Sequence, residues 1–432
     1  MKEFVFYYDV ICPYAYLASR LIEGLAENVG AKIRWRPVLL GGIYKATKQK
    51  EQQATKAYET MNPAKRLVLG KDLMRLYRRH NVPAMPFKSM PDLSTLKPMR
   101  LLAACEDENG EKRKNLTHRL YHALWAEKKD ISDESILQSE VAKLDWDVDV
   151  AAVVNGVDPS GKEILFENTN EAVKRGAFGV PSFWVNNRLY FGCDRLHFLE
   201  KELGKIDASP YRLVSSPQQP LTKRKLRIFH DFASPWCFIA QRRISSLLES
   251  VSPMQVEVEW VPILLGALFN AIGSPQVPMS REGEAKIKYV MDDFGEWCKY
   301  LSINNFKFPS GFPHKSLMAL RMTIANSKDE LRTAVYESAW TKDLDIGNSE
   351  VLAEVVKSAG CDPEELFSAA RSQEIKDKLR ENTERAISLG LCGVPSFQVD
   401  DQPVIWGQDR LNIIADELCG WQDDTDQIVS RL

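Results

Sequence analysis

Hydrophobic residues along this chain follow two periods, one typical of buried strands and one typical of amphipathic helices. The β-branched and aromatic run from Phe4 to Tyr8 predicts a strand, and the run from Leu226 to Phe229 predicts another. After each run, apolar residues recur every three or four positions, which predicts a helix with one buried face. Further strands are predicted at 33–35, 182–185, 256–260 and 396–399. Helix-forming sequence separates the second and third strands of each set, which indicates an α/β fold.

These patterns occur twice because the chain is a tandem duplication. The segment YYDVICPYAYLASRLI aligns with FHDFASPWCFIAQRRI and places Cys12 opposite Ser234. Further on, GAFGVPSFWV aligns with GLCGVPSFQV and places Pro181 opposite Pro395. The spacing between paired residues changes little along the copies, so few insertions separate them. Each copy is therefore expected to form the same fold.

The duplication predicts two domains joined by a linker. At 432 residues the chain is too long for a single hydrophobic core. The segment DASPYRLVSSPQQPLTKRK between the copies is rich in proline, serine and charge, which is typical of a linker. We therefore expect lobe one at residues 1–205, a linker at 206–224, lobe two at 225–421 and an acidic tail at 422–432.

Composition argues against several classes of function. The net charge is −2 and the basic residues are dispersed, so we expect no nucleic-acid partner. No apolar run is long enough to span a bilayer, and the N-terminal sequence lacks the order of a secretory signal. The eight cysteines show no metal-type pairing, which predicts free thiols in a reducing compartment and no metal site.

The residue before the first proline of each helix is the first candidate for chemistry. Cys12 precedes Pro13 and Ser234 precedes Pro235, and proline suits the first position of a helix. Backbone N–H groups and the helix dipole favour a sulfur anion at such a helix start. We therefore expect the pKa of Cys12 to fall below its usual value, which would make this cysteine a nucleophile. Ser234 has no neighbouring base in its motif and is better suited to donate its hydroxyl hydrogen to the thiolate of another molecule.

Both residues also have a simpler interpretation as helix N-caps, a position at which serine is preferred and cysteine is not. Cys237 stands where a Cys-x-x-Cys redox motif has its second cysteine, but CPYA lacks the second cysteine and SPWC lacks the first. This counts against a disulfide-forming catalyst that works within one motif. The remaining cysteines are expected to pack as small hydrophobic residues.

Two further motifs recur near the end of each lobe. Val180–Pro181 and Val394–Pro395 lie in Gly-Val-Pro-Ser, and a cis-proline there leaves the N–H and C=O of the valine free to pair with an extended ligand. A trans-proline that ends a helix is the alternative. Gly-x-Asp-Arg follows, and its Asp194 or Asp409 is expected to cap the last helix, to hold a ligand ammonium group, or both.

With these three motifs in this order around a helical insertion, the chain resembles the DsbA-like branch of the thioredoxin superfamily. Within that branch, both lobes are similar to kappa-class glutathione transferases and 2-hydroxychromene-2-carboxylate isomerases, which have D-x-x-S-P-[YFW] in place of Cys-x-x-Cys. Lobe two is the closer match, through DFASPW, GVPSF and WGQDRL. The resemblance implies an α/β fold of two DsbA-type thioredoxin domains, each with a large helical insertion.

The resemblance also implies a glutathione site. In lobe two, Ser234 would hold the glutathione thiolate and Val394, beside Pro395, would pair with the peptide backbone. The γ-glutamyl end would lie against Gln408 and Asp409. The implied site also includes Pro235 and Trp236 at the helix start and Ser274, which stands at or near an asparagine of the family. The equivalent residues of lobe one are Cys12, Val180, Pro181, Cys193 and Asp194.

The first hypothesis is therefore a glutathione-dependent transferase or isomerase, with glutathione as co-substrate and a small aromatic or electrophilic second substrate. The alternatives are a monothiol thiol–disulfide oxidoreductase that acts through Cys12, and a duplicated binding scaffold without catalysis. A dimer is left open.

The last three residues predict a location. Ser430-Arg431-Leu432 is one conservative change from the peroxisomal signal Ser-Lys-Leu. The kappa class, which the chain resembles, is found in mitochondria and peroxisomes. We therefore expect a peroxisomal location, with the cytoplasm as the first alternative and the mitochondrion as the weaker one.

Overall fold

The computed structural model describes residues 2–47, 61–84, 93–105, 110–216 and 223–422. Each half of the chain contains a four-stranded mixed sheet, and the strand orders are β2-β1-β3-β4 and β6-β5-β7-β8. In both sheets the first two strands pair in parallel and the other neighbours pair antiparallel. The strands are β1 (Lys2–Tyr8), β2 (Ala31–Pro37), β3 (Ser182–Val185), β4 (Arg188–Phe191), β5 (Arg224–His230), β6 (Val256–Pro262), β7 (Ser396–Val399) and β8 (Ile405–Trp406).

Helices cover both sheets and form the insertion between the second and third strand of each lobe. Those of lobe one are α1 (Pro13–Val29), α2 (Leu40–Ala46), α3 (Pro63–Arg79), α4 (Leu96–Ala104), α5 (Glu111–Trp125), α6 (Glu134–Val141), α7 (Val150–Asn155), α8 (Ser160–Lys174) and α9 (Leu196–Glu202). Those of lobe two are α10 (Pro235–Ser250), α11 (Leu265–Ala271), α12 (Glu284–Tyr300), α13 (Leu317–Ala325), α14 (Asp329–Trp340), α15 (Ser349–Ser358), α16 (Pro363–Arg371), α17 (Gln373–Ser388) and α18 (Leu411–Leu418). Short 3-10 turns are η2 (Cys193–Arg195), η3 (Pro278–Arg281) and η4 (Gln408–Arg410). The predicted α/β class with a helical insertion in each lobe is confirmed.

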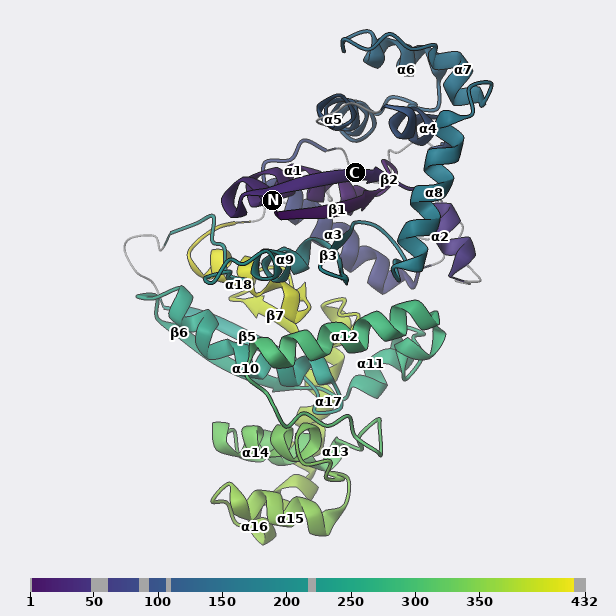
Figure 1. Cartoon of the computed structure of the whole chain (residues 1–432). Helices are drawn as coiled ribbons and strands as arrows, with labels where there is room; N and C mark the ends of the chain where they lie inside the picture. The colour runs from purple at the N-terminus through teal and green to yellow at the C-terminus, as the bar shows by residue number, and fades with distance from the viewer. Residues whose placement is uncertain (1, 48–60, 85–92, 106–109, 217–222, 423–432) are drawn as a thin grey trace.

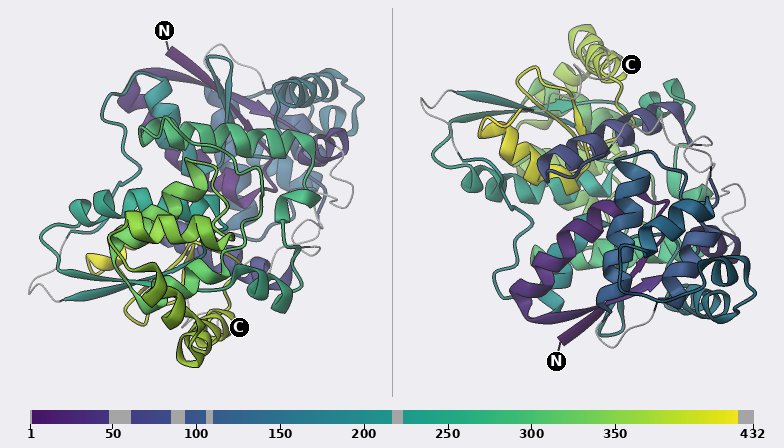
Figure 2. Two further views of the ribbon diagram at one scale, coloured as in Figure 1. Left: turned by 90° about the horizontal axis from the view of Figure 1, so that it is seen from below. Right: turned by 90° about the horizontal axis from the view of Figure 1, so that it is seen from above.

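The outer parts of the two insertions lie at opposite ends of the molecule, α5 to α7 at one end and α13 to α16 at the other (Figure 1). One helix from each insertion instead reaches the other lobe. The views in Figure 2 place α12 against lobe one and α3 against the strands of lobe two. The phenol of Tyr289 on α12 accepts a hydrogen bond from the N–H of Phe191 on β4 (2.8 Å), and α3 contacts β8.

A buried tryptophan joins each insertion to the loop after the first strand. The indole N–H of Trp125 donates to the carbonyl of Val10 (2.9 Å), and that of Trp340 donates to the carbonyl of Phe232 (2.9 Å). Both side chains are almost completely buried, so their only polar atom needs this partner. The pair explains why the sequence keeps a tryptophan at the same place in both copies.

The two lobes are joined by arginines that cross between them. Arg195 on η2 of lobe one donates from Nη2 to Asp293 on α12 (2.6 Å) and from Nη1 to Asp409 on η4 (2.7 Å). Arg195 and Asp293 are nearly fully buried. A buried guanidinium is tolerated only when carboxylates and hydrogen bonds compensate it, and both come here from the opposite lobe.

The duplication gives lobe two the reciprocal interaction. Arg410 on η4 donates from Nε to Asp72 on α3 (2.8 Å), from Nη2 to the same carboxylate (2.7 Å), and from Nη1 to Asp194 on η2. The same residue types in equivalent positions therefore form both halves of the interface. The contacts across the interface are therefore arranged as they are between two identical subunits related by a two-fold axis.

The part of the linker that the structure describes, residues 206–216, packs against both lobes. The phenol of Tyr211 donates to the carbonyl of Arg243 on α10 (3.2 Å). The N–H groups of Val214 and Ser215 donate to Asp416 on α18 (2.7 and 3.0 Å), which also binds Arg79 of α3 (2.8 Å). This segment is thus part of the lobe interface, although its composition is that of a linker.

The interface leads to a prediction about stability. Asp293→Asn should lower the free energy of unfolding by about 3 kcal/mol, because it removes a charge that compensates the buried Arg195. The adjacent Asp292 is the control, since its ion pair with Lys288 is exposed and Asp292→Asn should change stability by less than about 0.5 kcal/mol. Urea unfolding followed by circular dichroism measures both variants. Equal effects would contradict the importance of the crossed pair.

Candidate active sites

Each candidate site lies at the end of the first strand of its lobe, where α1 or α10 begins, and a buried aspartate fixes the loop there. Asp9 accepts hydrogen bonds from the N–H groups of Ile11 (3.2 Å) and of Leu40, the first residue of α2 (2.9 Å). Asp231 accepts the equivalent pair in lobe two at 3.0 and 2.9 Å. Burial raises the pKa of Asp9 to about 6. These carboxylates hold the helix starts in place.

The residue before each helix proline faces the Val-Pro turn, as the motifs predicted. The Val180–Pro181 and Val394–Pro395 peptide bonds are both cis, which confirms the interpretation of Gly-Val-Pro-Ser. The thiol of Cys12 donates to the carbonyl of Val180 (3.1 Å), and the hydroxyl of Ser234 donates to that of Val394 (3.2 Å). Residues more than 150 positions apart in the sequence therefore form one site in each lobe.

The two polar groups of each valine differ in availability. The sequence predicted that both the N–H and the C=O would be free, but the C=O is occupied by the cysteine or serine side chain. Within the described residues, the N–H groups of Val180 and Val394 donate no hydrogen bond. This N–H group is therefore unpaired among the described residues, whereas an extended ligand could pair with the C=O only if the side chain turned away.

A glycine allows an aromatic ring to cover each Val-Pro turn. A Cβ at Gly179 would lie 3.1 Å from the ring of Phe191 on β4. A Cβ at Gly393 would lie 3.0 Å from the indole nitrogen of Trp406 on β8. Any larger side chain would push the covering ring away, which explains the glycine in the motif.

Ser234 and Cys12 cap their helices differently. The Ser234 hydroxyl oxygen also accepts a hydrogen bond from the N–H of Cys237 (3.4 Å), so Ser234 is the N-cap of α10. Cys12 occupies the N-cap position of α1 without such a bond. The capping interpretation is thus confirmed for the serine alone, and it coexists with the contact to Val394.

The predicted reactivity of Cys12 is corrected by its burial. The side chain is only 8% exposed, and this burial raises the pKa of its thiol to about 12, although the N–H groups of Ala15 and Tyr14 act in the opposite direction. A helix start lowers a thiol pKa where water can also reach the sulfur, but desolvation disfavours the thiolate more strongly here. The predicted lowering of the pKa of Cys12 is therefore wrong for this structure, in which the thiol is a protonated hydrogen-bond donor at neutral pH.

Asp194 and Asp409 do not cap the last helices, contrary to one of the two predictions for them. Each lies inside a 3-10 turn, and α9 and α18 begin after it without a side-chain cap. Asp194 binds Arg410 and Asp409 binds Arg195. Sequence reasoning missed these arginines, although the Arg of Gly-x-Asp-Arg is present in both copies and was the available signal.

The remaining predicted site residues differ in the groups that they contact. Gln408 donates to Asp409 (2.6 Å), whereas the thiol of Cys193, at the equivalent place in lobe one, donates to the carbonyl of Tyr14 (3.4 Å). Pro235 and Trp236 form the first turn of α10. Ser274 follows α11, and no hydrogen bond among the described residues joins it to Ser234 or Val394.

An aromatic cluster stands next to the helix start of lobe two. The ring of Trp236 packs edge-on to Phe294 of α12 (centroids 5.3 Å apart), and Phe294 packs on Phe306 (4.5 Å). Lys65 of lobe one lies near the ring that covers the Val-Pro turn of lobe two, with its ammonium 5.9 Å from the ring centroid of Trp406. The site of lobe two therefore combines a hydroxyl donor with apolar surface and a cation from the opposite lobe.

All eight cysteines are free thiols, as predicted. In the described ranges there is no group of three or more His, Cys, Asp or Glu side chains that could hold a metal ion. No helix in the same ranges is both long and apolar enough to cross a membrane.

Comparison with known proteins identifies the family. A model of the DSBA-like thioredoxin domain matches residues 3–204 and again residues 225–419. The chain therefore belongs to the family of DSBA-like thioredoxin domain proteins and carries two copies of this domain.

The curated relatives each match about half of the chain. Glutathione S-transferase kappa 1 of Caenorhabditis elegans is 25% identical over 220 residues, which cover 48% of this chain and 93% of the relative. 2-Hydroxychromene-2-carboxylate isomerase of Sphingobium xenophagum is 28% identical over 209 residues, which cover 47% of this chain and 98% of the relative. A solved 2-hydroxychromene-2-carboxylate isomerase aligns with 48% of the chain at 20% identity and a TM-score of 0.38. Single-domain relatives that match one half are what a tandem duplication predicts.

The burial of Cys12 predicts its reactivity. Iodoacetamide near neutral pH should alkylate the partly exposed Cys361 before Cys12, because a thiol with a pKa of about 12 is almost entirely protonated there. Mass spectrometry after brief exposure compares the two sites, and urea-unfolded protein, in which both should react at similar rates, is the control. Preferential labelling of Cys12 would restore the nucleophile hypothesis.

Proposed function

We propose that lobe two is a glutathione-dependent transferase or isomerase site in which Ser234 stabilises the glutathione thiolate. The observation that carries the proposal is the Ser234 hydroxyl at the start of α10, 3.2 Å from the carbonyl before the cis-proline. A hydroxyl in that place can exchange its carbonyl acceptor for a sulfur anion. Both classes of curated relatives, the kappa transferases and the chromene carboxylate isomerases, support this choice.

The proposed chemistry begins with ionisation of the bound thiol. Its proton passes to water, and the Ser234 hydroxyl donates a charge-assisted hydrogen bond to the sulfur that remains. The N–H groups of the first turn of α10 add positive potential at the same point. The thiolate then uses one sulfur lone pair to form a bond to an electrophilic carbon of the second substrate, and the π-electron pair of the attacked double bond moves to the neighbouring electron-withdrawing group. Ser234 itself forms no covalent bond, in agreement with its lack of a neighbouring base.

Other residues would hold the rest of glutathione. The unpaired N–H of Val394 would donate to a peptide carbonyl, and Asp409, which is about one-third exposed, would accept from the γ-glutamyl ammonium group. Lys65 supplies a cation near Trp406 for a carboxylate. Because Lys65 belongs to lobe one, the proposed site of lobe two requires both lobes.

The aromatic cluster of lobe two favours an aromatic second substrate. Trp236 and Phe306 are half-buried beside the helix start and pack on the buried Phe294, and Phe308 is 46% exposed. Flat rings of this kind bind apolar and aromatic ligands. In a transfer the product keeps the new bond to the sulfur. In an isomerisation that bond breaks again, and glutathione is released unchanged.

Lobe one does not favour a redox function through Cys12. The thiol is buried, its pKa is raised to about 12, and it donates to Val180 much as Ser234 donates to Val394. A thiol is a weaker donor than a hydroxyl. We therefore assign Cys12 the role of a poorer donor, and we expect lobe one to bind glutathione with less activation of its thiol.

The proposal predicts the pH dependence of a Ser234→Ala variant. Loss of one hydrogen bond to a charged acceptor costs about 1.5–3 kcal/mol, so the pKa of bound glutathione should rise by about one to two pH units. The variant should retain glutathione but lose at least about tenfold in turnover at neutral pH, with recovery as the pH rises through the new pKa. Ultraviolet absorbance of the thiolate measures the titration.

A second N-cap serine provides the control. Ser372 caps α17 through the N–H of Ile375 (3.3 Å) and lies outside the site, so Ser372→Ala should leave the titration of bound glutathione unchanged. Identical titration curves for wild type and Ser234→Ala would show that Ser234 does not hold the thiolate.

We also propose a peroxisomal location, on the basis of the C-terminal Ser430-Arg431-Leu432. These residues lie outside the described part of the chain, whose last residue, Gln422, is exposed. A fluorescent protein fused to the N-terminus should give punctate signal with a peroxisomal marker, and the same fusion without the last three residues should be diffuse. Diffuse signal from both fusions would leave the cytoplasm as the location.

A further inference from the structure

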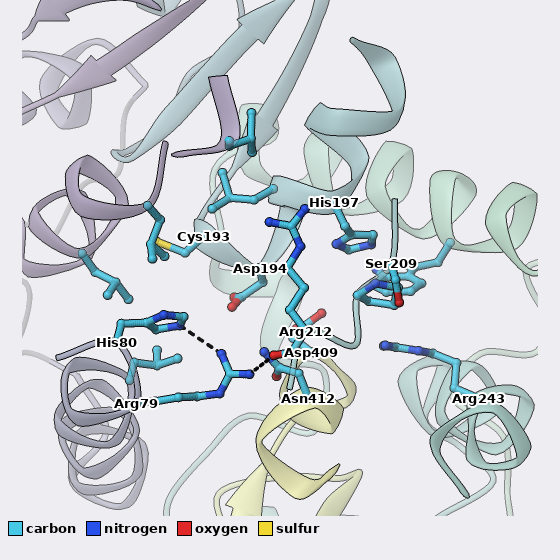
Figure 3. A pocket seen from close by; sticks show the side chains of 17 residues that line it. Arg79, His80, Cys193, Asp194, His197, Ser209, Arg212, Arg243, Asp409 and Asn412 are labelled. Carbon is cyan, nitrogen blue, oxygen red and sulfur yellow. Dashed lines mark hydrogen bonds between the residues drawn. The ribbon is translucent and has the colours of Figure 1, made fainter. Parts of the chain in front are cut away.

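A cavity of about 140 Å³ lies between the two lobes. Its walls come from α1, α3 and η2 of lobe one, from α10, α12 and η4 of lobe two, and from the linker (Figure 3). Neither Cys12 nor Ser234 lines it, and neither do Val180 and Val394. The cavity is therefore separate from the sulfur positions of the two candidate sites, although Asp194 and Asp409 border both.

Four of the five charged side chains in the wall are paired with opposite charges, and only the fifth, Arg243 on α10, forms no ion pair within the described chain. The pairs are Arg79 with Asp416, Arg212 with Glu200, Asp194 with Arg410, and Asp409 with Arg195. Burial lowers the pKa of His80 to about 4 and that of His197 well below its usual value, so both imidazoles are neutral. Arg243 is thus the one charged side chain of this wall that has no ion-pair partner within the described chain.

Arg243 is held in position but is not neutralised. Its side chain is 2% exposed, Nη1 donates to the carbonyl of Gln408 (2.7 Å), and the guanidinium lies 4.2 Å from the ring centroid of Trp297. A carbonyl and an aromatic face stabilise a cation less than a carboxylate does. Burial lowers the pKa of Arg243, although Tyr211 and Asp409 act in the opposite direction.

Hydrogen-bonding groups around Arg243 also lack partners. Within the described residues, Nε of Arg243, Nε1 of Trp297 and Nε2 of His197 are buried and form no hydrogen bond. The rings of His197 and Trp297 lie 5.2 Å apart, so the three groups are neighbours. Figure 3 shows Arg243 pointing into the cavity from the side opposite Arg79 and Cys193. Polar groups without partners are thus gathered around Arg243 on this side of the cavity.

The part of the wall that α1 forms is apolar, and this difference from α10 arises from the duplication. Leu17, Leu21 and Leu25 of α1 and Leu76 of α3 line the cavity. In the repeat, Leu21 is the counterpart of Arg243 and Leu76 is the counterpart of Trp297. Equivalent positions of the two lobes thus supply leucines on one side and a cation with its aromatic neighbour on the other.

We propose that this cavity binds a small organic anion, a carboxylate whose charged group lies at Arg243 and whose short apolar body lies along the leucines of α1. The volume is below that of a drug-sized pocket, so it suits a ligand with few heavy atoms. A carboxylate there would give Arg243 the ion pair that it does not form within the described chain. This site is additional to the glutathione site proposed for lobe two.

Hexanoate is a suitable probe, and hexanamide is its uncharged counterpart. Calorimetric titration of the full chain without glutathione should detect hexanoate binding and at least tenfold weaker binding of hexanamide. Butyrate, which is two methylene groups shorter, should bind roughly tenfold more weakly than hexanoate, because each methylene group adds apolar burial. Equal binding of hexanoate and hexanamide would overturn the role of the charge, and no binding of either would overturn the site.

Two neighbouring arginines give matched variants. Arg243→Leu copies the residue of lobe one and should weaken hexanoate binding at least tenfold. Arg242 is the next residue on α10 and forms a partly exposed ion pair with Glu337 (2.8 Å), so Arg242→Leu should leave hexanoate binding unchanged. If Arg243→Leu does not fold, the comparison of hexanoate with hexanamide on the wild-type chain still decides the proposal.

Competition separates this site from the glutathione site. Reduced glutathione should not displace hexanoate, and Ser234→Ala should bind hexanoate as the wild type does. Displacement of hexanoate by glutathione at matching concentrations would show that the cavity is the outer end of the glutathione site, which would overturn the proposal of a separate ligand. Hexanoate binding without any effect of Ser234→Ala on glutathione would instead contradict the proposed function alone.

Discussion

The crossed pairing of Arg195 and Arg410 with carboxylates of the opposite lobe determines how the two halves of this protein meet. A guanidinium cannot be buried without compensation, so each lobe covers its own arginine only when α3 or α12 of the other lobe brings an aspartate to it. The same arginines bind Asp194 and Asp409. The segments that follow each cis-proline turn are therefore positioned by both lobes together, and neither candidate site is complete within one domain.

Duplication within one chain has allowed equivalent positions to become different. Identical copies of a single-domain protein would present the same residues on both sides of their interface. Here a cysteine stands opposite a serine at the helix start, and Leu21 stands opposite Arg243 at the interface. The first difference gives the lobes donors of unequal strength. The second places a leucine on one side of the cavity and, on the other, an arginine without an ion pair within the described chain.

Local sequence signals were sufficient for most of the fold. β-Branched runs, the prolines at the helix starts and the glycines before Val-Pro act over a few residues, and the repeat confirmed each element by a second copy. The sites could be anticipated for the same reason, because Cys12 and Val180, or Ser234 and Val394, belong to motifs that the topology brings together. Composition alone, however, gave no indication that residues 206–216 pack between the lobes, since their partners are distant in sequence.

The sequence by itself determined the duplication, the α/β domains, the position of the helix starts and the residue types that meet the cis-prolines. The tertiary structure decided the state of those residues. The pKa of Cys12 is set by how completely surrounding side chains exclude water, and the role of Asp194 is set by an arginine of the other lobe. Desolvation and charge pairing depend on atoms from distant segments, and no local pattern of residues encodes their distances.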